Sequence, residues 1–314
     1  MMMDIFIAVI LDLLIGDPPN WPHPVRLIGR IITGLETWVR KRFVNLRAGG
    51  FILLLGTLLA VSLPIVLMNV IIPPPFLKIG NIYLLYTALA CRSLSDEAFR
   101  VKKHLDNQDI IGARKQLAMI VGRDTEDLDE AGIVRGVVET VSENTVDGIL
   151  SPLLFMLIGA PFGASVYLVW LFKAVSTLDS MVGYKQAHYA EIGYASAKAD
   201  DLLNLLPARL GALALIVSGL MFKLDVKRGI RVFLRDRNNH DSPNSAHPES
   251  AVAGLLGVQL GGTNQYFGMP VHKPTIGNPI VALNATHIDM TVKLAIVSEL
   301  LILSLAIIMM SLFL

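Results

Sequence analysis

A run of charged side chains within residues 122–152 could hold a metal ion or a phosphate group. Arg135, Glu139, Glu143 and Asp147 are four residues apart, a spacing that places them on one slowly drifting face of a helix. Like charges at that spacing repel one another unless a cation or a ligand compensates them. The run leads directly into an apolar stretch, where unpaired charge is costly. We therefore interpret this face as functional, although most charge runs are solvated helix faces.

Two further polar blocks and one proline-rich loop carry similar residue types. Residues 122–152 are the first block, and the second covers residues 173–209. Lys173 and Asp179 share a helical face, while Asp200, Asp201 and Asn204 repeat the combination of carboxylates and an amide. The third block covers residues 235–262. The loop covers residues 16–30, where four prolines predict a rigid segment that presents Asp17, His23 and Arg30. This loop is either a binding wall or an interfacial anchor, since Trp and Arg both favour membrane boundaries.

These residue types suit one kind of chemistry in particular. Mg²⁺ binds one or two carboxylates together with phosphate oxygens, and Arg and Lys bind phosphate groups. The sequence contains no GxxxxGK[ST], GxGxxG, HExxH or GxSxG motif. His240, His247 and His272 lack the i, i+4 spacing of helical metal ligands, so we interpret them as surface or capping residues. The pattern indicates a membrane enzyme acting on phosphorylated substrates with Mg²⁺; a transporter with polar half-helices fits almost as well.

Composition places these blocks in a membrane protein. Of 314 residues, 53% are hydrophobic and 17% charged, and the mean hydropathy is +0.57. The net charge of +1 gives no basis for binding polyanions, so we expect no nucleic-acid partner. The single cysteine, Cys91, cannot form an intrachain disulfide. The N-terminus lacks the basic region of a signal peptide, and we expect it to be retained.

We predict an all-α, polytopic helical membrane protein with helical polar loops, forming one membrane-embedded domain over residues 1–314. The expected spans lie at about 1–15, 50–72, 76–94, 149–176, 203–222 and 292–314. The fourth is broken at residues 159–163 and is either one kinked span or a re-entrant pair of half-helices. Further helices are expected over residues 33–47, from Asp124 or Thr125, and from Pro248.

The distribution of basic residues predicts the orientation of the polar blocks. Residues 17–49 contain six Lys and Arg, residues 93–148 contain seven and residues 223–291 contain seven. Cytoplasmic loops of membrane proteins carry an excess of these residues. We therefore expect all three segments, and the active-site loops with them, on the cytoplasmic side of the cell membrane.

The blocks also resemble a known family. GDPPNWPHPVRLIGR, GRDTEDLDEAGIVRGVVETVSENTVDGILSPL, KAVSTLDSMVGYK, KADDLLNLLPARL and RDRNNHDSPNSAHPESAVAGLLGVQLGG are together similar to the adenosylcobinamide-phosphate synthases of cobalamin biosynthesis. The resemblance covers nearly the whole chain, in order. It implies an ATP-dependent ligase that uses Mg²⁺ and attaches aminopropanol, or its phosphate, to a propionate side chain of adenosylcobyric acid through an amide. It also implies that other late-pathway membrane enzymes could associate with the protein.

The resemblance carries site roles onto matching positions. We assign catalysis to Glu139, Glu143, Asn144, Asp147 and Lys173, with Mg²⁺ at Glu143 and Asp147. Phosphate or substrate binding is assigned to Asp17, His23, Arg30, Arg123, Asp124, Asp179, Lys185, Asp200, Asp201, Asn204, Arg209, Arg235, Ser242, Asn244 and Glu249. Ala246 and His247 stand where the family has Gly and an aromatic residue, which concerns the choice of amine. The rival hypotheses are a corrinoid or metabolite transporter and a membrane phosphatase or amidase that needs no ATP.

Overall fold

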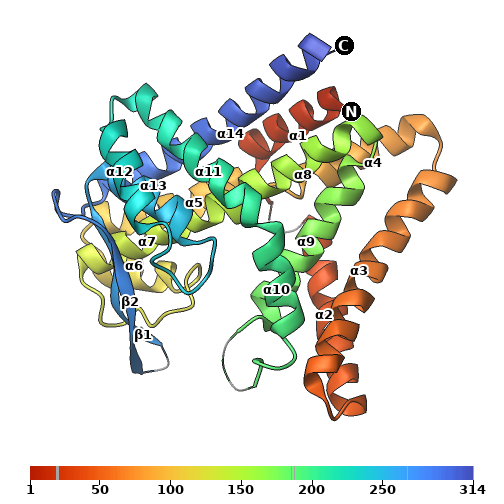
Figure 1. Cartoon of the computed structure of the whole chain (residues 1–314), viewed down its shortest axis with the longest axis horizontal. Coiled ribbons are helices and arrows are strands. Elements are labelled where there is room, and N and C mark those ends of the chain that lie inside the picture. The colour runs from red at the N-terminus through yellow and green to blue at the C-terminus, as the bar shows by residue number, and fades with distance from the viewer. Residues whose placement is uncertain (19–20, 185, 187, 267, 314) are drawn as a thin grey trace. The chain divides into compact units, whose positions relative to one another are not determined.

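The computed structural model describes residues 1–18, 21–184, 186, 188–266 and 268–313 (Figure 1). Within these residues every regular element is helical apart from one two-stranded antiparallel hairpin, which confirms the predicted all-α class. The chain divides into two compact units. The first contains residues 1–90 and 152–204, and the second contains residues 91–151 and 205–314.

The first unit is built from apolar helices. Its elements are α1 (Met2–Ile15), α2 (Pro24–Arg42), α3 (Leu46–Ile71), α4 (Pro74–Tyr86), most of α8 (Ser151–Gly159), the 3₁₀ turn η2 (Ala160–Phe162), α9 (Ser165–Val182) and α10 (Tyr194–Leu203). Helix α3 packs against α2 and α9. Gly163 follows η2 with a φ of +67°, which favours glycine and divides the stretch 149–176 into two helices. Phe155 of α8 and Phe172 of α9 stack with ring centroids 5.0 Å apart.

The second unit carries most of the polar residues of interest. Its elements are α5 (Cys91–Asp106), α6 (Ile110–Leu117), α7 (Glu130–Asn144), the π-helical η1 (Thr145–Leu150), α11 (Leu205–Ser218), the 3₁₀ turn η3 (Gly219–Phe222), α12 (Val226–Asp236), α13 (Ala246–Leu256), β1 (Gln259–Tyr266), β2 (Met269–Gly277) and α14 (Thr286–Phe313). Every residue of α13 is buried. Its small residues allow close packing, since a Cβ on Gly254 would lie 2.9 Å from the Cα of Gly229 in α12.

The protein is a multi-pass membrane protein. Within the described residues, the segments long and apolar enough to cross a bilayer are Leu46–Ile71, Glu130–Phe162, Ser165–Val182, Leu205–Phe222 and Thr286–Leu312. Helices α1 and α4 have 14 and 13 residues, fewer than the roughly 20 that a straight span needs. The crossings expected at 1–15 and 76–94 therefore stay predictions.

Several predicted helix boundaries are wrong. The expected rigid loop at 16–30 is shorter, because α2 already begins at Pro24, where a proline without an N–H is tolerated at the first helical position. That helix ends at Arg42 rather than Arg47. The helix expected over 76–94 ends at Tyr86, and a separate helix starts at Cys91.

The helix expected from Asp124 or Thr125 begins at Glu130 instead. Asp129 is its N-cap, with Oδ1 accepting a hydrogen bond from the Gly132 N–H at 2.8 Å. Asp124 and Thr125 make other contacts: Asp124 Oδ2 accepts from the Gly268 N–H at 2.7 Å, and the Thr125 hydroxyl donates to the Arg114 carbonyl at 3.0 Å.

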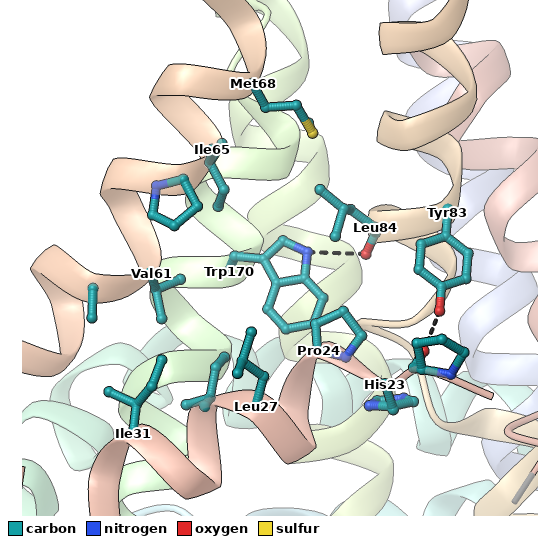
Figure 2. Close-up of a pocket in the computed structure, with 14 residues that line it drawn as sticks. His23, Pro24, Leu27, Ile31, Val61, Ile65, Met68, Tyr83, Leu84 and Trp170 are labelled. Atoms are coloured by element: carbon teal, nitrogen blue, oxygen red, sulfur yellow. Dashed lines mark hydrogen bonds between the residues drawn. The ribbon is translucent and has the colours of Figure 1, made fainter. Parts of the chain in front are cut away.

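An apolar cavity of about 370 Å³ lies in the first unit between α2, α3, α4 and α9 (Figure 2). Its lining includes Val61, Ile65 and Trp170, whose indole N–H donates to the Leu84 carbonyl at 3.0 Å. The His23 ring lies at its edge (Figure 2). This part of the proline-rich loop therefore faces an apolar space.

Candidate functional site

Helix α7 supplies two carboxylates to a cluster in the second unit. Glu139 and Glu143 are one turn apart and make contacts with β1 and with the start of α13, respectively. The predicted four-residue spacing thus holds as far as Glu143. Asp147 lies in the π-helical η1, where each turn contains more residues and a four-residue spacing no longer marks one face. Such π segments are frequent at functional sites.

The Glu139 carboxylate has a partner on each oxygen. Oε2 accepts a hydrogen bond from Arg123 Nη2 within an ion pair, and Oε1 accepts from the Gly261 N–H at 2.7 Å. Both side chains of the ion pair are less than a tenth exposed. A buried carboxylate with two donors, one of them charged, is compensated without a metal ion.

The contact from Gly261 depends on the glycine itself. Gly261 and Gly262 have φ values of +76° and +84° and lie at an irregularity in the pairing of β1 with β2. A Cβ at Gly261 would lie 2.3 Å from the Pro274 carbonyl oxygen. Only glycine can therefore occupy this position without moving the hairpin.

Asn264 of β1 joins two arginines to the cluster. Its Oδ1 accepts from Arg123 Nη1 at 2.8 Å and from Arg135 Nη2 at 3.3 Å, and the residue is 3% exposed. Two buried donors, Asn264 Nδ2 and Arg135 Nε, have no hydrogen-bond partner within the described residues. Buried donors are normally paired. An oxygen-rich ligand would satisfy both.

The other carboxylates face α13. Glu143 Oε1 accepts from the Ser245 hydroxyl at 2.6 Å, and within the described residues this is its one hydrogen bond. Glu249 is buried one turn into α13. Burial raises the pKa of its carboxyl well above the ordinary value, and the charges of Glu139 and Glu143 raise it further. The Glu249 carboxyl therefore takes up a proton more readily than an exposed glutamate does.

Lys273 of β2 and His240 form the basic side of the cluster. Burial acts to lower the pKa of Lys273, but Tyr266 and the carboxylates of Glu249, Glu143 and Glu139 outweigh it and raise the pKa. Burial and the neighbouring Lys273 charge lower the pKa of His240, whose Nε2 lies 3.3 Å from Lys273 Nζ. Lys273 is thus charged and His240 neutral at pH 7.

Of the two carboxylates on α7, one is available to bind Mg²⁺. Glu143 keeps one oxygen without a hydrogen bond, whereas both oxygens of Glu139 are engaged. A nucleotide-borne Mg²⁺ needs one or two protein carboxylates. Glu143 can supply one; Asp147 as a second ligand stays a prediction.

Other predicted residues of the second unit have structural contacts. Arg235 forms a two-pronged ion pair with Asp236, with Nε–Oδ1 and Nη2–Oδ2 distances of 2.6 and 2.7 Å. Ser242 Oγ accepts from the Asn244 N–H at 3.2 Å. Arg209 Nη1 donates to the Leu205 carbonyl. Asn144 is exposed at the end of α7, and its amide donates to the Thr140 carbonyl.

The histidine interpretation is wrong for His247. Its side chain is 1% exposed and meets the Phe233 ring edge-on at 5.8 Å. Burial and the charges of Arg209 and Arg237 lower its pKa to about 4, so the ring is neutral. His247 fills the space between α12 and α13, where an aromatic ring packs well. His272 is exposed, and His240 accepts from the Ser242 N–H as a capping residue does.

The remaining predicted residues belong to the first unit. His23 accepts from the Val25 N–H as N-cap of α2, and its Nε2 lies 3.2 Å from Asp17 Oδ1. Asp200 Oδ2 accepts from the Asn204 amide at 3.0 Å. Lys173 and Asp179 lie on α9, Asp201 on α10 and Arg30, exposed, on α2. Lys185 lies outside the described residues. Roles in one site with the α7 cluster stay predictions for all of them.

The comparisons with known proteins agree with one another. A family described as CobD/Cbib protein matches residues 5–295. The chain belongs to the CobD/CbiB family. It is 48% identical to the cobalamin biosynthesis protein CobD of Geobacter metallireducens over 305 residues, which cover 96% of this chain and 94% of that protein. It is 45% identical to the cobalamin biosynthesis protein CbiB of Salmonella paratyphi B, covering 95% and 94%. No solved structure matches the chain.

Membership of the CobD/CbiB family confirms the resemblance seen in the sequence blocks. Residues that sequence reasoning missed are Gly261, Asn264 and Lys273, all contributed by the hairpin. The double glycine and the alternating polar residues of β1 are signals that could have indicated this hairpin.

Proposed function

We propose that the protein acts in cobalamin biosynthesis as an adenosylcobinamide-phosphate synthase. The α7 cluster carries this proposal: three carboxylates, a charged lysine, two arginines and two unpartnered donors gather in a chain of the CobD/CbiB family. That combination suits a phosphorylated substrate and its metal ion.

The proposed reaction joins a carboxylate to an amine. An oxygen of the adenosylcobyric acid propionate attacks the γ-phosphorus of ATP, and the bond to ADP breaks, leaving an acyl phosphate. The amine of aminopropanol phosphate, or of aminopropanol, then attacks the acyl carbon. The carbon–oxygen bond to phosphate breaks, and the amine loses a proton to the departing phosphate as the amide forms.

The cluster contains groups that would bind phosphate, hold Mg²⁺ and position the donors. Asn264 Nδ2 and Arg135 Nε, which lack partners within the described residues, would donate to phosphate oxygens. Glu143 would hold Mg²⁺, which neutralises charge on the transferring phosphate. The Glu139–Arg123 ion pair positions Arg123 and Asn264. The first-unit residues Asp17, His23, Arg30, Lys173, Asp179, Asp200, Asp201 and Asn204 are proposed to bind corrinoid or phosphate.

The setting is also part of the proposal. The basic-residue distribution supports the cell membrane with the polar blocks on the cytoplasmic side. Adenosylcobyric acid, aminopropanol or its phosphate, and ATP would reach the cluster from the cytoplasmic side. Association with other membrane enzymes of the late pathway would pass the amphipathic corrinoid between them.

The direct test uses the full chain purified in detergent. It is incubated with adenosylcobyric acid, aminopropanol phosphate, ATP and Mg²⁺, and the corrinoid is followed by mass. Glu143→Gln is compared with Glu130→Gln, an exposed carboxylate at the start of the same helix. We expect the amide mass with wild type and Glu130→Gln, only with ATP, and little with Glu143→Gln.

Other results would change the proposal. Amide formation by Glu143→Gln at the wild-type rate would keep the reaction but remove Glu143 from the site. Corrinoid binding without any change of mass would favour the transporter. Loss of phosphate or ammonia without ATP would favour a phosphatase or amidase.

A further inference from the structure

A second cavity, in the second unit, has mixed polar and apolar walls. It measures about 440 Å³, and its lining includes Lys223, Lys293 and Met290. Lys223 directly follows the candidate span Leu205–Phe222, and Lys293 is in the first turns of the candidate span Thr286–Leu312. Helices α11 and α14 pack against each other. The cavity therefore lies at the membrane boundary of two neighbouring spans.

The acidic residues of this cavity already have partners. Asp225 caps α12 by accepting from the Arg228 N–H at 2.9 Å, and Asp289 Oδ2 lies 3.6 Å from Lys102 Nζ. The Arg228 guanidinium, also in the lining, donates to the Gly254 and Leu255 carbonyls at 2.7 and 2.9 Å. Its Nη1 also lies 4.0 Å from Asp225 Oδ2, so both its charge and its donors are largely engaged.

Lys223 and Lys293, unlike the other charged residues of the lining, are unpaired within the described residues. Neither ammonium group has an ion-pair partner anywhere in the described part of the chain, and both residues are exposed. Two uncompensated positive charges on one cavity attract an anion.

Lys223 also has an unusual backbone conformation. The residue has a φ of +54° after the last turn of η3, in the left-handed region. Glycine is the residue usually found there, because a side chain costs conformational energy. Lysine is therefore held at this position of the cavity lining at a conformational cost.

We propose that this cavity binds the headgroup of an anionic phospholipid such as phosphatidylglycerol. Lys223 and Lys293 contact the phosphate, while Leu224 and Met290 contact the glycerol and upper acyl carbons. The place of the cavity at the ends of two spans favours a lipid over a soluble phosphate, because headgroups are concentrated at that depth. Basic pockets between membrane helices are a known mode of lipid recognition.

The test is native mass spectrometry of the full chain in detergent, titrated with phosphatidylglycerol or phosphatidylcholine. Lys223→Gln/Lys293→Gln is compared with Lys103→Gln/Lys227→Gln, which removes two exposed lysines outside this lining. We expect phosphatidylglycerol to bind more tightly than phosphatidylcholine. The first variant should lose that preference, with affinity reduced roughly 30-fold for two lysines, and the control should keep it.

Two outcomes would overturn the proposal. Equal phosphatidylglycerol binding by wild type and Lys223→Gln/Lys293→Gln would exclude the cavity as the site. Displacement of the bound lipid by millimolar inorganic phosphate, with the same dependence on the two lysines, would assign the cavity to a soluble phosphate compound. Thermal unfolding of each variant checks that the fold is retained, and the result does not depend on the reaction that the protein catalyses.

Discussion

Arg123 and Glu139 form a buried ion pair between the loop that precedes α7 and the middle of that helix. The same guanidinium donates to Asn264, and the same carboxylate accepts from Gly261, so the pair also ties β1 to α7. A loop, a helix and a hairpin are thereby fixed around one pair of charges. The first prediction concerns the removal of one of them.

Arg123→Met leaves the Glu139 charge buried without its cation. Breaking a buried pair in this way costs about 3–5 kcal/mol of stability. We expect a clear fall in the thermal unfolding midpoint of the purified protein in detergent. The double variant Arg123→Met/Glu139→Gln should recover most of it, because both charges of the pair are removed and the amide oxygen still accepts from Gly261.

Arg100→Met is the control for this pair. Arg100 pairs with Glu97 on α5, but its side chain is 61% exposed. Exposed pairs contribute about 0–1 kcal/mol. Equal losses for Arg123→Met and Arg100→Met would show that the buried pair contributes no more to stability than a surface pair.

Gly261→Ala should distort the hairpin. The positive φ costs a non-glycine residue about 1–2 kcal/mol, and the 2.3 Å contact with the Pro274 oxygen adds a further 1–3 kcal/mol of overpacking. Displacement of the Gly261 N–H from Glu139 should also lower activity. Unfolding midpoints and turnover measure the two effects.

Gly268→Ala separates backbone strain from steric overlap. Gly268 has a φ of +74°, but a Cβ there would have no atom within 4 Å. We expect a loss of only about 1–2 kcal/mol and activity near wild type. If both alanine variants behave alike, the close approach of Gly261 to Pro274 has no functional consequence.

The polar face of α7 can be predicted from the sequence because both features that indicate it are local. The four-residue spacing of Glu139 and Glu143 follows from helix geometry, and the adjacent apolar run makes charge there costly. Their partners could not be predicted in the same way. Gly261 and Ser245 are more than a hundred residues away, and no pattern in the sequence specifies which distant donor meets which carboxylate.

Helix boundaries failed for a related reason. Asp124, Thr125 and Asp129 are all suitable N-caps, and tertiary contacts decide among them: Asp124 binds the Gly268 N–H, which leaves Asp129 to cap α7. The π-helical turn that contains Asp147 has no sequence signature either. Apolar spans such as α3 are predictable, since their length and composition suffice.

Glu249→Gln should change how stability depends on pH. The folded protein raises the pKa of this carboxyl above its unfolded value of about 4.3. Between the two values the folded state binds more protons than the unfolded state, so wild-type stability falls as pH rises. The contribution of Glu249 to the free energy of unfolding is thus fully present below about pH 4 and is lost as the pH rises to the folded pKa.

The glutamine variant lacks this titration. We expect Glu249→Gln to match the wild-type unfolding midpoint at low pH and to exceed it increasingly as pH rises above the unfolded pKa of about 4.3 towards the folded pKa. Glu126→Gln, at an exposed position, is the control and should follow wild type throughout. A constant difference between Glu249→Gln and wild type across the pH range would contradict a raised pKa of Glu249.

Metal binding should distinguish the two carboxylates of α7. Glu143 has an oxygen available, whereas Glu139 has a donor on each oxygen. With Mn²⁺ in place of Mg²⁺ and a non-hydrolysable ATP analogue, paramagnetic resonance reports the affinity without any turnover. We expect Glu143→Gln to weaken Mn²⁺ binding at least about tenfold, as loss of a direct ligand should exceed the effect of an outer-shell change. Glu139→Gln should bind close to wild type. Equal weakening by both variants would mean that the Arg123–Glu139 pair opens when the nucleotide binds and that Glu139 then becomes a second ligand.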